Sequence, residues 1–305
     1  MILITGGSGF LARGIMKLWP EEDYVVYSRD EYKQDLCKKQ FVNSRTNIKY
    51  VLGDVKDYDR LVATLRANEV DTVIHTAAVK FIPEAEYNVN ECISVNVDGT
   101  RNVLLACWHA DVESVIGIST DKACLPVNTY GMTKAIMERL FIEQARLNKW
   151  CNYGLVRYGN VIGSTGSVIP LFQEQADAHG QITITDPEMT RYWITIEEAV
   201  DLVGLALSTG DGSIVIPKPR SMTLQELASV FSKSIKVVGV RPGEKRHEQL
   251  LHQQESVRAI DTGTHYVLKE SGVYSEPFIL SSNTPEAGWY TREEMLEAIE
   301  GARTI

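Results

Sequence analysis

The sequence contains few cysteines and no excess of positive charge. Its five cysteines form no CxxC pair, and because their number is odd we interpret them as reduced, mostly buried thiols of a reducing compartment. They are Cys37, Cys92, Cys107, Cys124 and Cys151. With 31 Lys and Arg against 40 Asp and Glu, the net charge is −9, which argues against non-specific nucleic-acid binding because that activity needs a basic face. A local basic pocket for a phosphorylated small molecule is compatible with this balance.

Long apolar runs are absent as well. No run approaches the length of a membrane-spanning helix, and no basic segment or signal-like apolar stretch precedes the first expected strand, Ile2–Thr5. The sequence therefore predicts a cytoplasmic protein with no membrane partner. Hydrophobic residues at 44% and charged residues at 23% are ordinary for a globular enzyme and exclude a disordered or fibrous chain.

Short, almost continuously apolar segments alternate with longer helical patterns through the first half of the chain. The expected strands are Ile2–Thr5, Tyr24–Ser28, Ile48–Leu52, Thr72–His75, Ser114–Ile118 and Tyr153–Tyr158. The clearest expected helices between them are Asp57–Asn68, Val89–His109 and Asn128–Lys149. Near-continuous hydrophobicity is typical of strands that are covered on both faces. The alternation predicts an α/β fold, a doubly wound Rossmann sheet of parallel strands with a smaller C-terminal substrate-binding lobe.

The pattern weakens after Gly163, where residues 164–187 read as irregular with several glycines. We predict a Rossmann domain over residues 1–163, completed by about 190–216, and a lobe assembled from 164–189 and 217–290. Within the completing segment, Ile196–Leu207 reads as a helix and Ser213–Ile216 as a strand. Residues 291–305 form the expected closing helix, with Thr291 as its N-cap and Glu294 three residues later.

A glycine-rich turn follows the first expected strand and opens a helix. Gly6 permits the tight turn, Gly9 lets the backbone approach a pyrophosphate, and Ala12 is small enough for close helix–strand packing. The helix N-terminus adds N–H groups and a partial positive charge. We assign to the cofactor the turn residues Gly6, Gly7, Ser8, Gly9, Phe10 and Leu11. The competing interpretation is a purely structural glycine-rich turn.

The end of the second expected strand bears on which dinucleotide binds. An acidic residue there binds the ribose hydroxyls of NAD, whereas an Arg accommodates the 2′-phosphate of NADP. Arg29 comes first, with Ser28 beside it and Lys33 nearby, which favours NADP. Asp30 keeps NAD open, because a shift of one residue in the strand end would exchange the two roles. Asp54 and Val55, after the third strand, and Ala77 and Ala78, after the fourth, stand where the adenine and ribose would pass.

A candidate catalytic group follows the fifth strand. Tyr130 and Lys134 are spaced i, i+4 on an expected helix and therefore share a face. We expect the Lys134 charge, with the nicotinamide cation, to lower the pKa of the Tyr130 phenol from its usual value of about 10, so that it can accept a proton from a sugar hydroxyl. Thr120, at the strand end, can donate a hydrogen bond to the same oxygen. The alternative is an ordinary amphipathic helix.

With these motifs the chain resembles an extended short-chain dehydrogenase/reductase, and more specifically the soluble inverting UDP-N-acetylglucosamine 4,6-dehydratases of bacterial surface-sugar and flagellin-glycan pathways. The runs that carry the resemblance are Ser28–Glu31, Ser119–Ala123, Tyr158–Ser164, Thr185–Arg191 and Arg241–Lys245. Two positions depart from the family pattern: Ala12 replaces a glycine, and Phe81 stands where the family often has His.

The resemblance implies an acid/base pair beyond the Thr, Tyr and Lys that sugar epimerases use. In that reading Lys122 removes the C5 proton of the sugar and Asp121 protonates the leaving C6 hydroxyl. Both roles require shifted pKa values, lowered for Lys122 and raised for Asp121, which desolvation favours and their mutual attraction opposes. The resemblance further implies a UDP-sugar as the substrate, inversion at C5 and a homo-oligomer. The alternative for this pair is a capping Asp and a surface Lys.

The remaining assigned residues belong to the nucleotide-sugar pocket or complete the cofactor site, and we assign no metal ligand. Cofactor contacts are assigned to Lys80, Asn96, Tyr158, Asn160 and Val161, besides Tyr130 and Lys134. Substrate contacts are assigned to Lys80, Asn160, Ser167, Val168, Arg191, Lys218, Arg241 and Glu244. Arg191 and Arg241 suit a pyrophosphate because guanidinium groups bind phosphate in a fork geometry. Two other functions stay open: a UDP-sugar 4-epimerase, and a non-catalytic NADP-sensing regulator.

Overall fold

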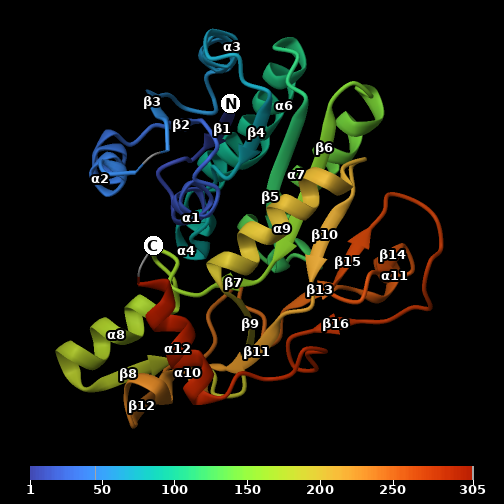
Figure 1. The fold of residues 1–305 in the computed structure, drawn as a ribbon. Coiled ribbons are helices and arrows are strands. Elements are labelled where there is room, and N and C mark those ends of the chain that lie inside the picture. Colours follow the sequence, from blue (N-terminus) through green and yellow to red (C-terminus); the bar gives the residue numbers. More distant parts are fainter. Residues whose placement is uncertain (45, 304–305) are drawn as a thin grey trace.

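A computed structural model describes residues 1–44 and 46–303 (Figure 1). Its centre is a sheet of nine strands, in the order β14-β15-β10-β6-β5-β4-β1-β2-β3, within the described part of the chain. The strands are β1 Ile2–Thr5, β2 Tyr24–Ser28, β3 Ile48–Leu52, β4 Thr72–His75, β5 Ser114–Thr120, β6 Asn152–Tyr158, β10 Ile214–Pro217, β14 Ala259–Asp261 and β15 His265–Leu268. From β3 to β10 every pairing is parallel, so the carboxyl ends of these strands lie along one edge. The predicted Rossmann sheet is confirmed.

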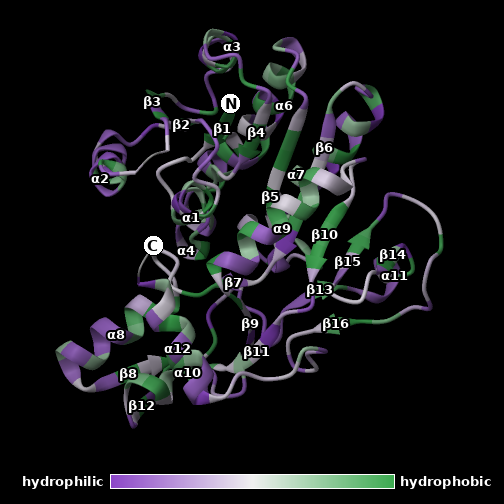
Figure 2. Ribbon diagram, in the orientation of Figure 1, coloured by the Kyte–Doolittle hydropathy of each residue, from purple (hydrophilic) through white to green (hydrophobic). Residues whose placement is uncertain are grey.

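Helices cover both faces of this sheet. On one face, α3 (Tyr58–Ala67), α6 (Gly99–His109) and α7 (Thr129–Leu147) contribute to one buried apolar cluster. On the other face, α1 (Phe10–Leu18) and α9 (Ile196–Thr209) contribute to a second cluster. The strands between them are buried on both sides, which explains their near-continuous hydrophobicity (Figure 2).

The Rossmann part contains further helices beside these. Helix α2 spans Glu31–Phe41 and α4 spans Ile82–Tyr87. The predicted helix over Val89–His109 consists of α5 (Val89–Ile93), a π-helical turn η1 (Ser94–Asp98) and α6 in direct succession. All five cysteines are free and buried, as predicted.

A smaller lobe lies beyond the carboxyl edge of the sheet (Figure 1). Its helices and strands are β7 Asn160–Val161, α8 Val168–His179, β8 Gln181–Ile184, β9 Thr190–Ile194, β11 Arg220–Thr223, α10 Leu224–Phe231, β12 Ser234–Val237 and α12 Arg292–Ala302. They enclose a third cluster that includes Phe172, Trp193 and Met295. The irregular segment predicted over 164–187 is wrong, because α8 and β8 occupy most of it.

Two further differences concern the ends of the predicted segments. β14 and β15, inside the range expected for the lobe, instead extend the central sheet by antiparallel pairing onto β10. The pair β13 (Gln249–Leu251) and β16 (Leu280–Ser281) packs into the apolar cluster on the α7 face of the sheet, and the short helix α11 (Gln253–Ser256) follows β13. Thr291 caps α12 with Glu294 in a capping box, as predicted.

Candidate active site

The glycine-rich turn joins β1 to α1 at the point where the strand order reverses, between β1 and β4. Gly6 has φ +64, and a Cβ atom built on Gly7 would lie 2.6 Å from the Ile4 carbonyl oxygen, so both positions require glycine. A Cβ on Gly9 would meet only the Gly6 carbonyl oxygen, at 3.0 Å, which leaves this side of the turn open. Gly9 is the N-cap of α1 and offers no side-chain cap, so the first N–H groups of α1 are available to an anion. The turn fits the pyrophosphate of a dinucleotide.

The side chains of Arg29 and Asp30, which follow β2, have different environments. The strand ends at Ser28, and Asp30 is the N-cap of α2, where its Oδ1 accepts a hydrogen bond from the Lys33 N–H at 2.9 Å. The Arg29 side chain is 59% exposed, and its guanidinium lies 3.4 Å from Glu91 and 3.6 Å from Asp54. Arg29 is therefore the group that faces outward at this strand end.

The end of β5 brings three candidate residues together. The Thr120 hydroxyl donates to Asp121 Oδ1 at 2.8 Å, and Lys122 Nζ donates to the same oxygen at 2.9 Å. Asp121 is fully buried, and its Oδ2 has no hydrogen-bond partner. Residues Asp121–Ala123 form a 3₁₀ turn, η2, against which α7 packs so closely that a Cβ on Gly131 would lie 2.2 Å from the Lys122 carbonyl oxygen. Gly131 thus sets the approach of Tyr130 to the Asp121–Lys122 turn.

Tyr130 and Lys134 lie on α7, as predicted, but their electrostatics differ from expectation. Burial raises the pKa of Tyr130 to about 12, while the Lys122 charge and a hydrogen bond with Thr120 act in the opposite direction. Lys134 is 3% exposed, and burial lowers its pKa to about 8. Its Nζ donates to the Met137 sulfur at 3.0 Å. In this structure Lys122, rather than Lys134, is the cation that acts to lower the pKa of Tyr130.

The pKa of Lys122 is raised, which contradicts the predicted lowering. Desolvation does act to lower it, but the carboxylates of Asp121 and Glu248 outweigh that effect, and Arg191 only partly opposes them. The physical reason is the neighbour that sequence reasoning missed: Glu248 Oε1 lies 3.7 Å from Lys122 Nζ. Glu248 follows the Arg241–Lys245 run, whose sequence gave no sign that it reaches η2.

The loop after β4 carries Ala77, Ala78 and Lys80 towards the glycine turn. A Cβ on Gly6 would meet the Ala77 backbone at 3.0 Å, so the two loops are in contact. The Asn96 amide is buried and holds this loop, since it accepts from the Val79 N–H at 2.8 Å and donates to the Val79 carbonyl at 3.0 Å. Lys80 Nζ donates to the Thr165 carbonyl at 2.9 Å.

The other assigned residues lie in the Rossmann part and in the lobe. Tyr158 ends β6 near Tyr130, Val55 is buried in the core, and Asn160 and Val161 form β7. Ser167 is the N-cap of α8, with no partner for its hydroxyl, and Val168 begins that helix. Arg191 donates to the Thr190 and Arg246 carbonyls at 2.8 and 3.2 Å. Lys218 is held by Asp261 at 2.8 Å and Glu286 at 3.3 Å.

Residues 241–248, which we call the strap, cross from the lobe to η2 and the start of α7. Asn128 Nδ2 donates to the Gly243 carbonyl at 2.8 Å, and Lys245 Nζ donates to the Cys124 carbonyl at 2.6 Å. Arg241 is exposed, and its N–H donates to Glu244 Oε2 at 3.3 Å. The strap therefore places both assigned substrate residues beside the Tyr130 helix.

Comparison with known proteins shows the family of this chain. Residues 2–270 match the model of the family described as polysaccharide biosynthesis protein. The chain belongs to this family. A Campylobacter jejuni relative named UDP-N-acetylglucosamine 4,6-dehydratase (inverting) is 40% identical over 283 residues, 88% of this chain and 83% of the relative. A Rickettsia bellii relative named UDP-glucose 4-epimerase is 36% identical over 287 residues, 89% of this chain and 83% of the relative.

Two solved structures share the fold of this chain. Pen from Bacillus thuringiensis superposes with a TM-score of 0.91 at 30% identity, covering 100% of this chain and 98% of Pen. DesIV from Streptomyces venezuelae, a dTDP-glucose 4,6-dehydratase solved with NAD and TYD, has a TM-score of 0.72 at 21% identity, covering 80% and 86% of the two chains. That likeness concerns the fold alone.

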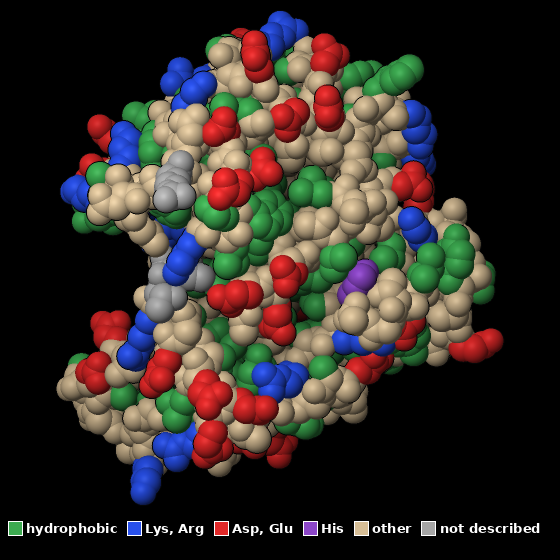
Figure 3. Space-filling model, viewed as in Figure 1, with side chains coloured by type: hydrophobic (Ala, Val, Ile, Leu, Met, Phe, Trp, Pro, Cys, Tyr) green, Lys and Arg blue, Asp and Glu red, His purple; other side chains and the backbone are tan. Residues whose placement is uncertain are grey.

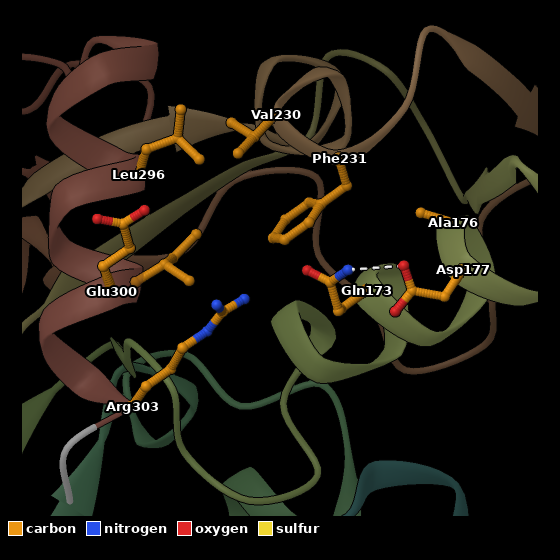
Figure 4. Close-up of a pocket in the computed structure, with 9 residues that line it drawn as sticks. Gln173, Ala176, Asp177, Val230, Phe231, Leu296, Glu300 and Arg303 are labelled. Atoms are coloured by element: carbon orange, nitrogen blue, oxygen red, sulfur yellow. Dashed lines mark hydrogen bonds between the residues drawn. The ribbon is translucent and has the colours of Figure 1, made fainter.

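Other features of the surface lie apart from this site. A hollow of about 310 Å³ between α8, α10 and α12 is lined by Phe231, Leu296 and Arg303 among others, and none of the assigned residues borders it (Figure 4). Acidic side chains are spread among basic ones on the face seen in Figure 3.

Within residues 1–44 and 46–303, no helix is long and apolar enough to cross a membrane. No group of three His, Cys, Asp or Glu side chains is arranged for a metal ion in the same residues.

Proposed function

We propose that the protein is an NADP-dependent 4,6-dehydratase that converts UDP-N-acetylglucosamine to a UDP-4-keto-6-deoxy sugar with inversion at C5. The proposal rests on the contact between the helix that carries Tyr130 and the turn that carries Asp121 and Lys122. Gly131 lets the Tyr130 helix touch the turn that carries Asp121 and Lys122, so an oxidation site and an elimination site share one edge of the sheet. The relative named for this reaction matches 88% of the chain.

The first half of the reaction is oxidation at C4. A dinucleotide bound at the glycine turn would accept the C4 hydride and return it to C6 within the same turnover. Tyr130 accepts the proton of the 4-hydroxyl, while the Thr120 hydroxyl supports the oxygen and Lys122 stabilises the tyrosinate. The Lys134 ammonium is buried and donates to a thioether, a weak acceptor, so it suits a ribose hydroxyl of the cofactor.

The second half removes water across C5 and C6. The C4 ketone acidifies the C5 hydrogen, one member of the Asp121–Lys122 pair takes that proton, and the other gives a proton to the C6 oxygen, which leaves as water. Hydride addition at C6 and a new proton at C5 complete the product. The net change is the loss of one water, and the cofactor returns to its oxidised form.

Two features support NADP over NAD and a UDP-sugar over other substrates. The Asp30 carboxylate is committed to the α2 cap, which leaves Arg29 as the outward group for a 2′-phosphate. The strap brings Arg241 and Glu244 to the side of α7, where a guanidinium suits the diphosphate and a carboxylate suits the uridine ribose. Inversion at C5 follows the name of the Campylobacter relative.

The test is mass spectrometry of UDP-N-acetylglucosamine incubated with the purified protein and NADP⁺ in deuterated water. The proposal expects a product that is lighter by one water, apart from the label, and carries deuterium at C5. NMR of the same product then reports the configuration at C5. Tyr130→Phe should bind NADP and lose turnover by about two to four orders of magnitude. Full activity of that variant would remove Tyr130 from the mechanism.

A UDP-sugar 4-epimerase is the second candidate, because several Rickettsia relatives at about a third identity carry that name. An epimerase would give an isomer of unchanged mass in the same experiment. It would also make no use of Asp121 and Lys122 in proton transfer at C5. The mass of the product therefore separates the two candidates, whereas loss of activity in Lys122→Ala would not, because Lys122 also stabilises the Tyr130 tyrosinate at the oxidation step.

We also propose that the protein is a homo-oligomer. Several large apolar side chains on α7 and the loop before it are exposed. Exposed apolar surface of this kind is typical of an interface between subunits. The exposed side chains are Leu125, Val127, Met132 and Ile136. Light scattering of the purified protein measures its mass, and a value near 34.1 kDa would contradict the proposal.

A further inference from the structure

A second carboxylate reaches the Asp121–Lys122 pair from a distant part of the sequence. Glu248 lies in the strap, and its backbone is fixed by Ser282, whose hydroxyl accepts from the Glu248 N–H at 2.9 Å and whose N–H donates to the Glu248 carbonyl at 2.8 Å. Its side chain is 4% exposed. A carboxylate in such a place is costly to bury unless charged partners compensate it.

The partners are two ammonium groups, one on each oxygen. Glu248 Oε1 lies 3.7 Å from Lys122 Nζ, and Oε2 lies 3.5 Å from Lys245 Nζ. Neither ion pair includes a hydrogen bond of good geometry, and Oε2 has no hydrogen-bond partner in the structure. Glu248 is thus held by charge rather than by a tight bond. Lys122 in turn donates its one short hydrogen bond to Asp121.

The charged groups around Lys122 come from four parts of the fold. Asp121 precedes it in η2, Glu248 and Lys245 come from the strap, Arg191 from β9, and Tyr130 from α7. Asp121 and Glu248 stabilise the ammonium, whereas Arg191 destabilises it. Lys245 acts on Lys122 indirectly, because it neutralises part of the Glu248 charge.

We propose that Glu248 is a positioning residue of the elimination site, which holds the Lys122 side chain between two carboxylates and sets the pH at which it transfers a proton. The inference rests on the proposed function, since only a dehydration needs Lys122 for proton transfer. It adds a member to the site that the Asp121–Lys122 pair does not contain. The raised pKa of Lys122 agrees with this arrangement.

The inference has a consequence that does not depend on the role of Lys122. When Glu248 becomes Gln, the ammonium loses one of its two counter-charges, so Lys122 gives up its proton at lower pH. If Lys122 works as the neutral base at C5, the acid limb of the pH–rate profile moves to lower pH. If it works as the ammonium that protonates the leaving oxygen, the alkaline limb moves to lower pH instead. The limb that moves identifies the role.

The experiment compares the pH dependence of kcat for water loss from UDP-N-acetylglucosamine in wild type, Glu248→Gln and Glu276→Gln. Glu276 is an exposed carboxylate outside the strap, so its variant should match wild type. For Glu248→Gln we expect one limb to move down by about one pH unit or more, from the loss of a charge at this distance. Unchanged limbs, or a uniform drop in rate at every pH, would overturn the inference.

A second variant keeps the test decisive if Glu248→Gln does not fold. Lys245→Met leaves Glu248 without its competing cation, so Lys122 is held more strongly and the same limb should move to higher pH. A shift to lower pH, or no shift, would overturn the inference. If wild type releases no water from any UDP-sugar, the proposed function fails, and that result is distinct from a wild type that dehydrates with limbs insensitive to both variants.

Discussion

The side-chain amide of Asn128 joins α7 to Gly243 of the strap, because its oxygen and its nitrogen each form a hydrogen bond. Its Oδ1 accepts from the Gly131 N–H at 2.8 Å and caps α7, while its Nδ2 donates to the Gly243 carbonyl at 2.8 Å. The side chain is 4% exposed, so water cannot easily replace either bond. Asn128, together with the Lys245 contact to the Cys124 carbonyl, therefore helps to fix the strap that carries Arg241 relative to Tyr130.

Asn128→Asp separates the two functions of the amide. An aspartate is as good an N-cap as asparagine, so α7 should keep its start, but a carboxylate cannot donate to Gly243. We expect the KM for the UDP-sugar to rise by about tenfold, the equivalent of one buried hydrogen bond, with little change in thermal stability. Steady-state kinetics and a melting curve measure both.

Asn128→Ala provides the comparison, because it removes the cap as well. It should lose about 1 kcal/mol of stability in addition to the rise in KM. An Asn128→Asp protein with wild-type KM would show that the strap stays in place without this bond.

The sequence predicts those parts of the site whose signals are local. The glycine turn, the Tyr130–Lys134 spacing and the Thr120–Lys122 run each lie within one strand–turn–helix unit, so their geometry follows from a few neighbouring residues. Glu248 and Asn128 carry no such signal. Lys122 and Glu248 are brought together by pairing between β13 and β16, which are two or three residues long and have no readable alternation.

The helices and strands also differ in how well the sequence predicts them. The strands β1, β2, β4, β5 and β6 are predicted because burial on both faces makes them almost continuously apolar, while the edge strand β3 is only partly buried and is predicted from its apolar residues. Helix α8 was missed because its N-cap Ser167 follows two glycines with positive φ and Pro170 stands in its first turn, so the segment reads as a loop. The strands β14 and β15 were missed because they are short and join the sheet only after a long excursion through the lobe.

Arg29→Ala tests the choice of dinucleotide. A charge-assisted bond between a guanidinium and the 2′-phosphate contributes about 1.5–3 kcal/mol, so the Kd for NADP should rise roughly ten- to a hundredfold while that for NAD changes little. Fluorescence titration with each dinucleotide measures the two constants. Lys39→Ala, an exposed cation on the same side of the sheet in α2, is the control and should leave both unchanged. Equal losses for NADP and NAD would remove the argument for NADP.

Lys134→Met should stabilise the protein while it abolishes turnover. Burial lowers the pKa of Lys134 to about 8, so the folded state holds the charged form at a cost below that pH. Removing the charge should raise the free energy of unfolding by about 2 kcal/mol at pH 7. The cost disappears as pH rises from the folded pKa towards the unfolded value near 10.5, so the variant's advantage should shrink between pH 8 and 10.

Urea unfolding without nucleotide at pH 7 and pH 10 measures this advantage. Lys149→Met, at an exposed cation just beyond the same helix, should change neither value. A Lys134→Met protein that is less stable than wild type at pH 7 would mean that the ammonium has a stabilising partner besides Met137.

Glu255→Gln tests a buried ion network that fastens α11 and β13 to the sheet. The Arg157 guanidinium contacts Glu138 at 2.7 Å and Glu255 at 2.5 Å, and it donates to the Leu250 carbonyl at 2.8 Å. All three charged side chains are at most 7% exposed. Gln at position 255 removes one of the two short charge-assisted contacts of Arg157 and leaves Glu138 as its other carboxylate, which should cost about 1.5–3 kcal/mol.

The pH dependence distinguishes this charge effect from lost packing. Arg157 lowers the pKa of Glu255, so its contribution is complete above the unfolded value near 4.5 and is lost as pH falls through the lower folded value. The difference in unfolding free energy between wild type and Glu255→Gln should therefore be constant from pH 6 to 8 and shrink below about pH 4. A difference that persists at low pH would assign the loss to packing, and a difference under 1 kcal/mol at pH 7 would mean that Glu138 alone compensates Arg157.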